Sequence, residues 1–178
     1  MIRFFIVLTL GAVALSGTVL GKSLELTKNA RSIFIEEKPD WKMGKDLFGM
    51  PFIYFSPKKN GQRSNISFTD TGANLALDMK ALADNQADFK KNKDAWAKTV
   101  GATTLEFSPY EVKETKLGHK IHQIGFSYKH ENKIYFERSN YIECRGKIIF
   151  SKSLRLKENE KHEKDFQELL HGLDCGGV

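Results

Sequence analysis

The stretch that decides the fold is residues 120–156, KIHQIGFSYKHENKIYFERSNYIECRGKIIFSKSLRL. Four side chains of its first segment alternate with the others and share one face of an extended strand: His122, Ile124, Phe126 and Tyr128. Short polar turns at 130–132 and at Arg145–Gly146 divide the stretch into three strands. The pattern predicts an antiparallel meander with one covered face.

A fourth strand precedes this stretch as TTLEFSPYEVKE, residues 103–114. Pro109 cannot donate a ladder hydrogen bond, so we expect this strand to be an edge strand or to be bulged at that point. The meander is therefore predicted to contain four strands.

Shorter strands are expected upstream, because SIFIE at 32–36, PFIYFSP at 51–57 and SNISFTD at 64–70 are rich in β-branched and aromatic residues. Asn60–Gly61, between the last two, is a hairpin signal. The segment 38–50, KPDWKMGKDLFGM, interrupts this pattern with proline and glycines. It predicts a structured loop around its tryptophan.

Two amphipathic helices complete the expected fold. A helix from Asn74 to about Val100, with a break near Asn85, would carry one apolar stripe: Leu75, Met79, Leu82, Phe89, Trp96 and Val100. Gln86 and Lys93 interrupt that stripe, and Lys90, Lys91 and Lys93 are expected on the wet side or its margin. A closing helix over 158–173 would bury four residues: Phe166, Leu169, Leu170 and Leu173. The predicted fold class is α+β, an antiparallel meander packed with a long central helix and a C-terminal helix in an α/β/α sandwich.

The first 21 residues are typical of a signal peptide. Arg3 gives a positive start, an apolar run follows to Leu15, and small residues precede the expected cleavage after Gly21. The alternative, an uncleaved anchor, is disfavoured because about a dozen apolar residues fall short of the roughly 20 that cross a bilayer. We therefore expect residues 22–178 to form a single exported domain, periplasmic or secreted, with no membrane span after cleavage.

The charge of the chain is mildly basic. Of its 28 Lys and Arg and 22 Asp and Glu, signal cleavage would remove only Arg3, which leaves a net charge of +5. The lysines are interleaved with acidic residues along the chain, a pattern typical of a solvated surface and not of a nucleic-acid-binding one. We expect no nucleic acid among the partners.

The two cysteines, Cys144 and Cys175, are expected to form a disulfide, since isolated pairs in exported proteins usually do. A redox-active or metal-binding pair is the alternative, but it lacks C-x-x-C spacing. Four residues of the last hairpin are the candidates to point inward with this bridge: Ile142, Cys144, Ile148 and Phe150.

No motif for catalysis, phosphate binding or dinucleotide binding occurs, so no catalytic residue, cofactor or metal ligand is assigned. His119 and His122 lie three apart in an extended segment and would point to opposite faces. His122 is expected to pack among aromatic rings, and the other histidines to lie at the surface. Three hypotheses remain: an exported, soluble, non-catalytic binding or accessory domain acting through a protein partner, an envelope hydrolase or metal-dependent enzyme, and an inhibitor or immunity-type protein.

The candidate partner surface lies in WKMGKDLFGMPFIYFSP, residues 41–57, which concentrates large apolar side chains between glycines. Trp41, Phe48 and Met50 are the residues we expect to bind a partner. Core packing is the alternative for much of the stretch.

This order of elements, with short strands and a hairpin, a long helix, a meander and a closing helix, resembles the PsbP-like α/β/α sandwich over most of residues 24–175. The resemblance rests on element order and on the tryptophan-containing segment before the first helix. It implies a non-catalytic adaptor or binding module. No functional residue is carried over, because no family motif is matched residue by residue.

Overall fold

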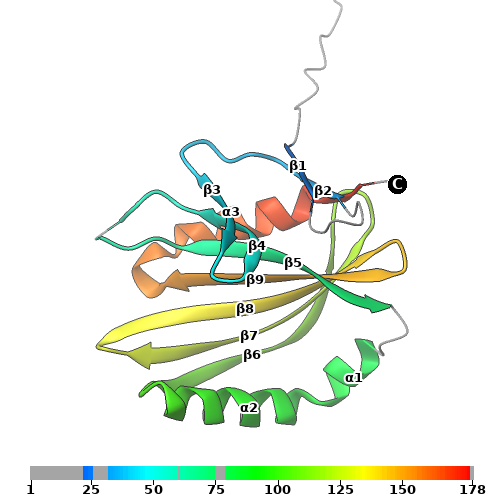
Figure 1. The fold of residues 1–178 in the computed structure, drawn as a ribbon. Coiled ribbons are helices and arrows are strands. Elements are labelled where there is room, and N and C mark those ends of the chain that lie inside the picture. Colours follow the sequence, from blue (N-terminus) through cyan, green and yellow to red (C-terminus); the bar gives the residue numbers. More distant parts are fainter. Residues whose placement is uncertain (1–21, 26–31, 60, 75–78, 177–178) are drawn as a thin grey trace, which may run out of the picture.

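The computed structural model describes residues 22–25, 32–59, 61–74 and 79–176 (Figure 1). The predicted signal peptide, the predicted helix position Leu75 and the turn residue Asn60 lie outside the described residues. The described strands form a seven-stranded sheet, in the order β3-β4-β5-β9-β8-β7-β6, and a three-stranded sheet, in the order β1-β2-β10.

All neighbouring strands in both sheets run antiparallel. The large sheet contains β3 (Lys42–Leu47), β4 (Met50–Phe55), β5 (Asn65–Asn74), β6 (Thr103–Glu114), β7 (Lys120–His130), β8 (Lys133–Cys144) and β9 (Lys147–Leu156). The small sheet contains β1 (Lys22–Glu25), β2 (Ser32–Ile35) and β10 (Asp174–Cys175). The four predicted meander strands, β6 to β9, are confirmed.

Local chemistry explains the turns and the edge of the meander. Arg145 and Gly146 have φ values of 47° and 76°, as a two-residue hairpin turn requires. Strand β6 is the edge of the large sheet, and its register with β7 shifts between Ser108 and Glu111. Both expectations for Pro109 are therefore confirmed: its strand is an edge strand and is irregular around the proline.

The expected long helix is two helices, α1 (Met79–Asp84) and α2 (Gln86–Thr99). The predicted break at Asn85 is confirmed, because the Asn85 carbonyl accepts the first backbone bonds of α2, from Asp88 and Phe89. The expected start at Asn74 is wrong, since β5 continues through that residue and pairs it with Lys147. The closing helix is α3 (Lys161–His171), preceded by the 3-10 turn η1 (Lys157–Asn159).

Helices cover both faces of the large sheet, so the expectation of one covered face is wrong. Strand β7 is buried continuously from Ile121 to Tyr128, which requires packing on both sides. On the α2 side the buried residues are Ala97, Ala102, Phe126 and Tyr128. On the α3 side, the four predicted helix residues are buried with Phe52, Tyr54, Ile66, Phe68, Ile121, Ile142 and Ile149. Figure 1 shows α2 running along the β6 edge and α3 on the other side of the sheet.

The β8–β9 register shows that two of the four residues expected to point inward in the last hairpin point to the other face. Ile142 lies opposite Ile149, so these two share the α3 face with Cys144. Ile148 and Phe150 therefore point to the other face. The period-two rule applies to each strand separately, and the phase of β9 relative to β8 is set by the Arg145–Gly146 turn.

Lys93 lies at the margin of the wet side of α2, one of its two expected positions, with its side chain 24% exposed. Its ammonium lies 2.7 Å from Glu137 Oε1 and 4.8 Å from the centre of the Phe126 ring, between α2 and the sheet. Glu137 projects from the middle of the sheet and is 7% exposed, so the carboxylate needs a cation from the covering helix. In turn Trp96 and Val100, expected on the buried stripe, remain partly exposed.

Candidate functional site

The segment around Trp41, predicted as a structured loop, is the hairpin β3–β4. Phe48 and Gly49 form its two-residue turn, with φ values of 55° and 72°, and Leu47 pairs with Met50. Gly44 leaves room for the Leu47 side chain, because a Cβ there would lie 2.4 Å from Leu47 Cδ1. We call Leu47–Met50 the β3–β4 tip.

Phe48 stands out at this tip. It is 86% exposed and occupies a left-handed turn position that Asn or Gly adopts readily and a bulky side chain does not. Neither burial nor turn geometry accounts for a phenylalanine at this position. A residue held in a strained backbone conformation that no packing contact explains is often part of a functional site.

The base of the same hairpin is fixed to α3. The Trp41 ring packs edge-on against Phe166 and His162, with centroids 5.6 and 5.7 Å apart. Lys38, just upstream, pairs with Glu168 and lies 3.6 Å from Asp165. The hairpin is therefore anchored at one end and presents its exposed aromatic ring at the other.

The structure places two of the three sequence-predicted surface residues, Phe48 and Met50, at the β3–β4 tip, and the third, Trp41, at the base of the hairpin. Trp41 and Phe48 lie at opposite ends of the six-residue strand β3, roughly 20 Å apart. Met50 is half-buried, and its sulfur lies 3.6 Å from Thr69 Oγ1. Leu47, which the sequence did not single out, is exposed beside Phe48.

The exposed charges near the tip are mixed. Lys45 and Asp46 are adjacent and exposed on β3, whereas Lys42 and Lys58 lie at the base of the hairpin, near Phe55. Lysines on an edge strand also discourage strand addition by another chain. The tip therefore presents exposed apolar side chains beside one basic and one acidic residue.

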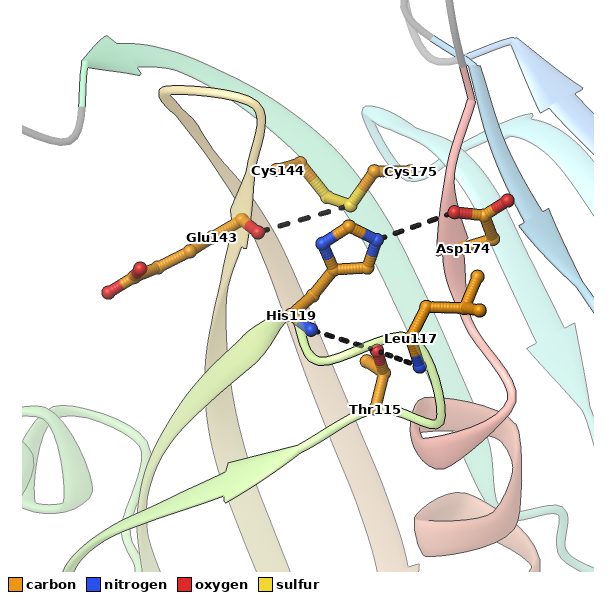
Figure 2. Close-up of a disulfide and its surroundings, with 7 residues drawn as sticks. All are labelled: Thr115, Leu117, His119, Glu143, Cys144, Asp174 and Cys175. Carbon is orange, nitrogen blue, oxygen red and sulfur yellow. Dashed lines mark hydrogen bonds and ion pairs between the residues drawn. A yellow bond between two sulfur atoms is a disulfide. The ribbon is translucent and has the colours of Figure 1, made fainter.

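At the C-terminus, Cys144 and Cys175 form a disulfide with their Cα atoms 5.4 Å apart (Figure 2). Around it, Thr115 Oγ1 accepts bonds from the backbone of Leu117 and His119, and the His119 ring lies 3.4 Å from Asp174 Oδ1. The Leu117 loop is held to α3, because the Lys116 amide donates to the His171 carbonyl at 2.7 Å. The chain end after α3 is thus fastened to the meander.

One buried histidine lies in a hydrogen-bonded chain across three strands. His122 Nδ1 is 2.5 Å from the Tyr110 hydroxyl, and Nε2 is 2.6 Å from Glu143 Oε1. Its ring stacks on Tyr110, as expected for a histidine among aromatics. Burial, then the Glu143 charge, raises the pKa of Tyr110, so the phenol stays protonated and is not an activated nucleophile. The chain fastens the edge strand β6 to β7 and β8.

His162 was expected at the surface and is instead buried. Its Nδ1 lies 2.8 Å from the hydroxyl of Ser64, which is itself fully buried. The sequence signal was available, because His162 precedes Phe166 by four residues and so continues the apolar stripe of α3. Ser64 is inaccessible to a substrate, so the pair fastens the β4–β5 connection to α3.

This burial predicts a pH dependence of stability. Burial lowers the pKa of His162 below 6.5, so the unfolded chain binds a proton that the folded chain resists. The contribution of His162 to the free energy of unfolding should be complete above about pH 6.5, and the free energy of unfolding should fall as the pH drops below that value. Urea midpoints measured from pH 8 to pH 5 should show this slope, and His162→Gln should flatten it. The matched variant His171→Gln leaves His162 in place and should keep the slope of the unaltered protein. Equal slopes in all three proteins would contradict the assignment of the pH dependence to His162.

Within the described residues, no three His, Cys, Asp or Glu side chains gather where they would hold a metal ion. None of the helices described is long and apolar enough to cross a membrane.

Helical layers on opposite faces of one antiparallel sheet define an α/β/α sandwich. No protein-family model and no curated protein matches the sequence. Among solved structures, PsbP (CyanoP) from the cyanobacterium Synechocystis sp. PCC 6803 aligns with a TM-score of 0.58 at 11% identity, covering 94% of this chain and 99% of that one. LpqN of Mycobacterium tuberculosis, involved in cell envelope biogenesis, aligns at 0.56 and 11%, covering 83% and 85%. The chain therefore has a PsbP-like fold, as the element order predicted.

Proposed function

We propose that this protein is an exported, non-catalytic accessory domain that binds a protein partner through the β3–β4 tip. The observation that carries the proposal is Phe48, a large aromatic side chain 86% exposed on a hairpin anchored at its base. Binding energy in protein interfaces concentrates in a few such residues. A rigid anchor also loses little conformational entropy on binding.

The chemistry around the tip defines the partner. Phe48 and Leu47 would enter an apolar pocket, and the neighbouring Lys45 would face a carboxylate at its rim. The partner is thus a protein with an apolar depression that receives Phe48. An enzyme blocked by this domain fits the same description, so an inhibitory role is one outcome of the experiment below.

Export is supported by the N-terminal sequence and by the disulfide, since disulfides persist in oxidising compartments. The similarity to LpqN, a protein of cell envelope biogenesis, agrees with this compartment at the level of fold alone.

Substitution at the tip separates binding from stability. Phe48→Asn should weaken the partner complex about 30-fold, as loss of a roughly 2 kcal/mol anchor does. The same change places Asn-Gly in the turn and should leave the fold as stable or raise the free energy of unfolding by up to about 1 kcal/mol. Titration calorimetry with the purified partner and urea unfolding measure the two effects.

The matched control is Leu117→Ala, which removes a side chain 62% exposed in the β6–β7 connection, at the opposite edge of the large sheet. It should leave binding unchanged. Equal affinity of Phe48→Asn and the unaltered protein, or a loss confined to Leu117→Ala, would refute the β3–β4 tip as the binding surface.

A further inference from the structure

Four chain segments come together at one end of the large sheet, on the left in Figure 1. They lie between β4 and β5, at the end of α2, around the β7–β8 turn and between β9 and α3: 56–64, 98–102, 129–133 and 157–161. We call these four segments the basic end. None of their residues belongs to the β3–β4 tip.

Strand pairing and a side-chain contact hold these segments side by side. Lys129 pairs with Thr103, the residue directly after the α2 segment. Across the sheet, Lys59 Nζ donates to the Glu158 carbonyl at 3.0 Å and so joins the β4–β5 connection to the segment after β9. The basic end thus reaches from β4 to β6 along the order β4-β5-β9-β8-β7-β6. At about 4.8 Å between neighbouring strands, its width is roughly 25 Å.

The charge of the basic end equals the whole net charge expected after signal cleavage. It contains eight basic residues: Lys58, Lys59, Arg63, Lys98, Lys129, Lys133, Lys157 and Lys161. It contains three acidic ones, Glu131, Glu158 and Glu160, which leaves +5. The rest of residues 22–178 carries 19 basic and 19 acidic side chains. The interleaving along the chain conceals this asymmetry, because the four segments meet only in the fold.

The side chains of the basic end are available to a ligand. All seven of its lysines are exposed, and each of them except Lys59 is without a hydrogen bond or ion pair to any residue that the structure describes. Apolar side chains lie beside them. Val100, at the end of α2, is 41% exposed, and Leu105, where the β6–β7 register shifts, is 51% exposed.

Width and composition indicate the class of ligand. A surface roughly 25 Å wide is larger than a single small anion needs. Protein interfaces favour arginine and are depleted in lysine, whereas seven of the eight cations here are lysines. Lysines are attracted to anionic lipid headgroups without fixed pairing. A nucleic-acid backbone offers charge but no place for Val100 and Leu105, which suit the boundary between headgroups and acyl chains.

We propose that the basic end docks the protein on a membrane surface that displays anionic phospholipid headgroups. The lysines lie over the headgroups, and Val100 and Leu105 enter the interface. The protein is held peripherally by this contact, and the β3–β4 tip, a separate surface, stays available to a protein partner.

Sedimentation of the exported protein with lipid vesicles tests the proposal. Vesicles of equal parts phosphatidylglycerol and phosphatidylcholine should bind the protein. Vesicles of phosphatidylcholine alone should bind it at least about 30-fold more weakly. Salt at about 0.5 M should release most of the bound protein, because the screening length then falls to roughly 4 Å.

Paired substitutions locate the surface. Lys129→Gln combined with Lys133→Gln should lower the partition onto anionic vesicles about 30-fold, since each lysine near such a surface contributes roughly fivefold. The matched control combines Lys116→Gln with Lys120→Gln, which removes the same charge from two exposed lysines at the β6–β7 connection. It should lower the partition by less than about threefold. Leu105→Gln should weaken binding about fivefold without any change of charge.

Equal binding to neutral and anionic vesicles, or an equal loss in the two paired variants, would overturn the proposal. Binding to polyglutamate or to a DNA duplex but not to the anionic vesicles would assign the surface to another class of ligand and would also overturn it. The measurement needs no protein partner, so its failure would leave the function proposed for the tip untouched.

Discussion

Replacing both Cys144 and Cys175 by alanine is expected to lower the free energy of unfolding by about 3 to 4 kcal/mol, the loop-closure entropy for a bridge of this span. The two cysteines are 31 positions apart, and they hold the two-residue strand β10 against the meander. Urea unfolding should show the loss. The thermal midpoint should fall by roughly 10 °C for a chain of this length.

The control for this variant is the unaltered protein after reduction, which loses the bridge without any change of side chain. Both proteins should unfold at the same urea concentration. A loss below about 1 kcal/mol in both would mean that the chain end is held by α3 and the strand pairing alone. Mass measurement of the natively exported protein, with and without reductant, independently reports whether the bridge is present.

The second large effect is expected at Lys93. Lys93→Met keeps the apolar stem over the Phe126 ring but removes the cation beside Glu137, leaving a nearly buried carboxylate with Lys152 at 3.7 Å as its neighbour. The expected loss is about 3 kcal/mol, the lower part of the range for breaking a buried ion pair, because the Lys93 side chain is 24% exposed. Chemical denaturation measures it.

A double-mutant cycle isolates the pair. Combining Lys93→Met with Glu137→Gln removes the stranded charge, so the double variant should be more stable than Lys93→Met alone. Lys91→Met, on the exposed side of α2, should change stability by less than about 0.5 kcal/mol. If Lys93→Met were as stable as Lys91→Met, the Lys93 ammonium of α2 would not be the cation that stabilises the Glu137 carboxylate on the sheet.

The meander could be predicted from sequence because each of its strands carries its own information. Alternation, β-branched residues and turn chemistry are local, and they agree over residues 120–156. The same holds for α3, whose apolar stripe is complete within one helix. Element order then sufficed to indicate the PsbP-like fold.

What failed depends on contacts between distant segments. Lys93 is expected on the wet side or its margin, and nothing in α2 reveals that Glu137, 44 positions away, is buried beneath it. The joining of β5 to β9, which extends the meander into seven strands, is likewise a long-range pairing. The strand β3 was mistaken for a loop because its glycine and turn residues are also typical of loops.

Of the three residues that we expect to bind a partner, Phe48 is the most exposed. Trp41 was grouped with it because both are aromatic and close in sequence, but a strand six residues long separates them and α3 takes the tryptophan.

The most direct measurement of the central claim is site-specific crosslinking in the organism that makes the protein. A photoreactive phenylalanine analogue is placed at position 48, and in a separate strain at position 117. Position 48 should give one adduct of defined mass with a single protein, and position 117 should give none. An adduct at position 117 with none at position 48 would contradict the claim that the β3–β4 tip binds the partner.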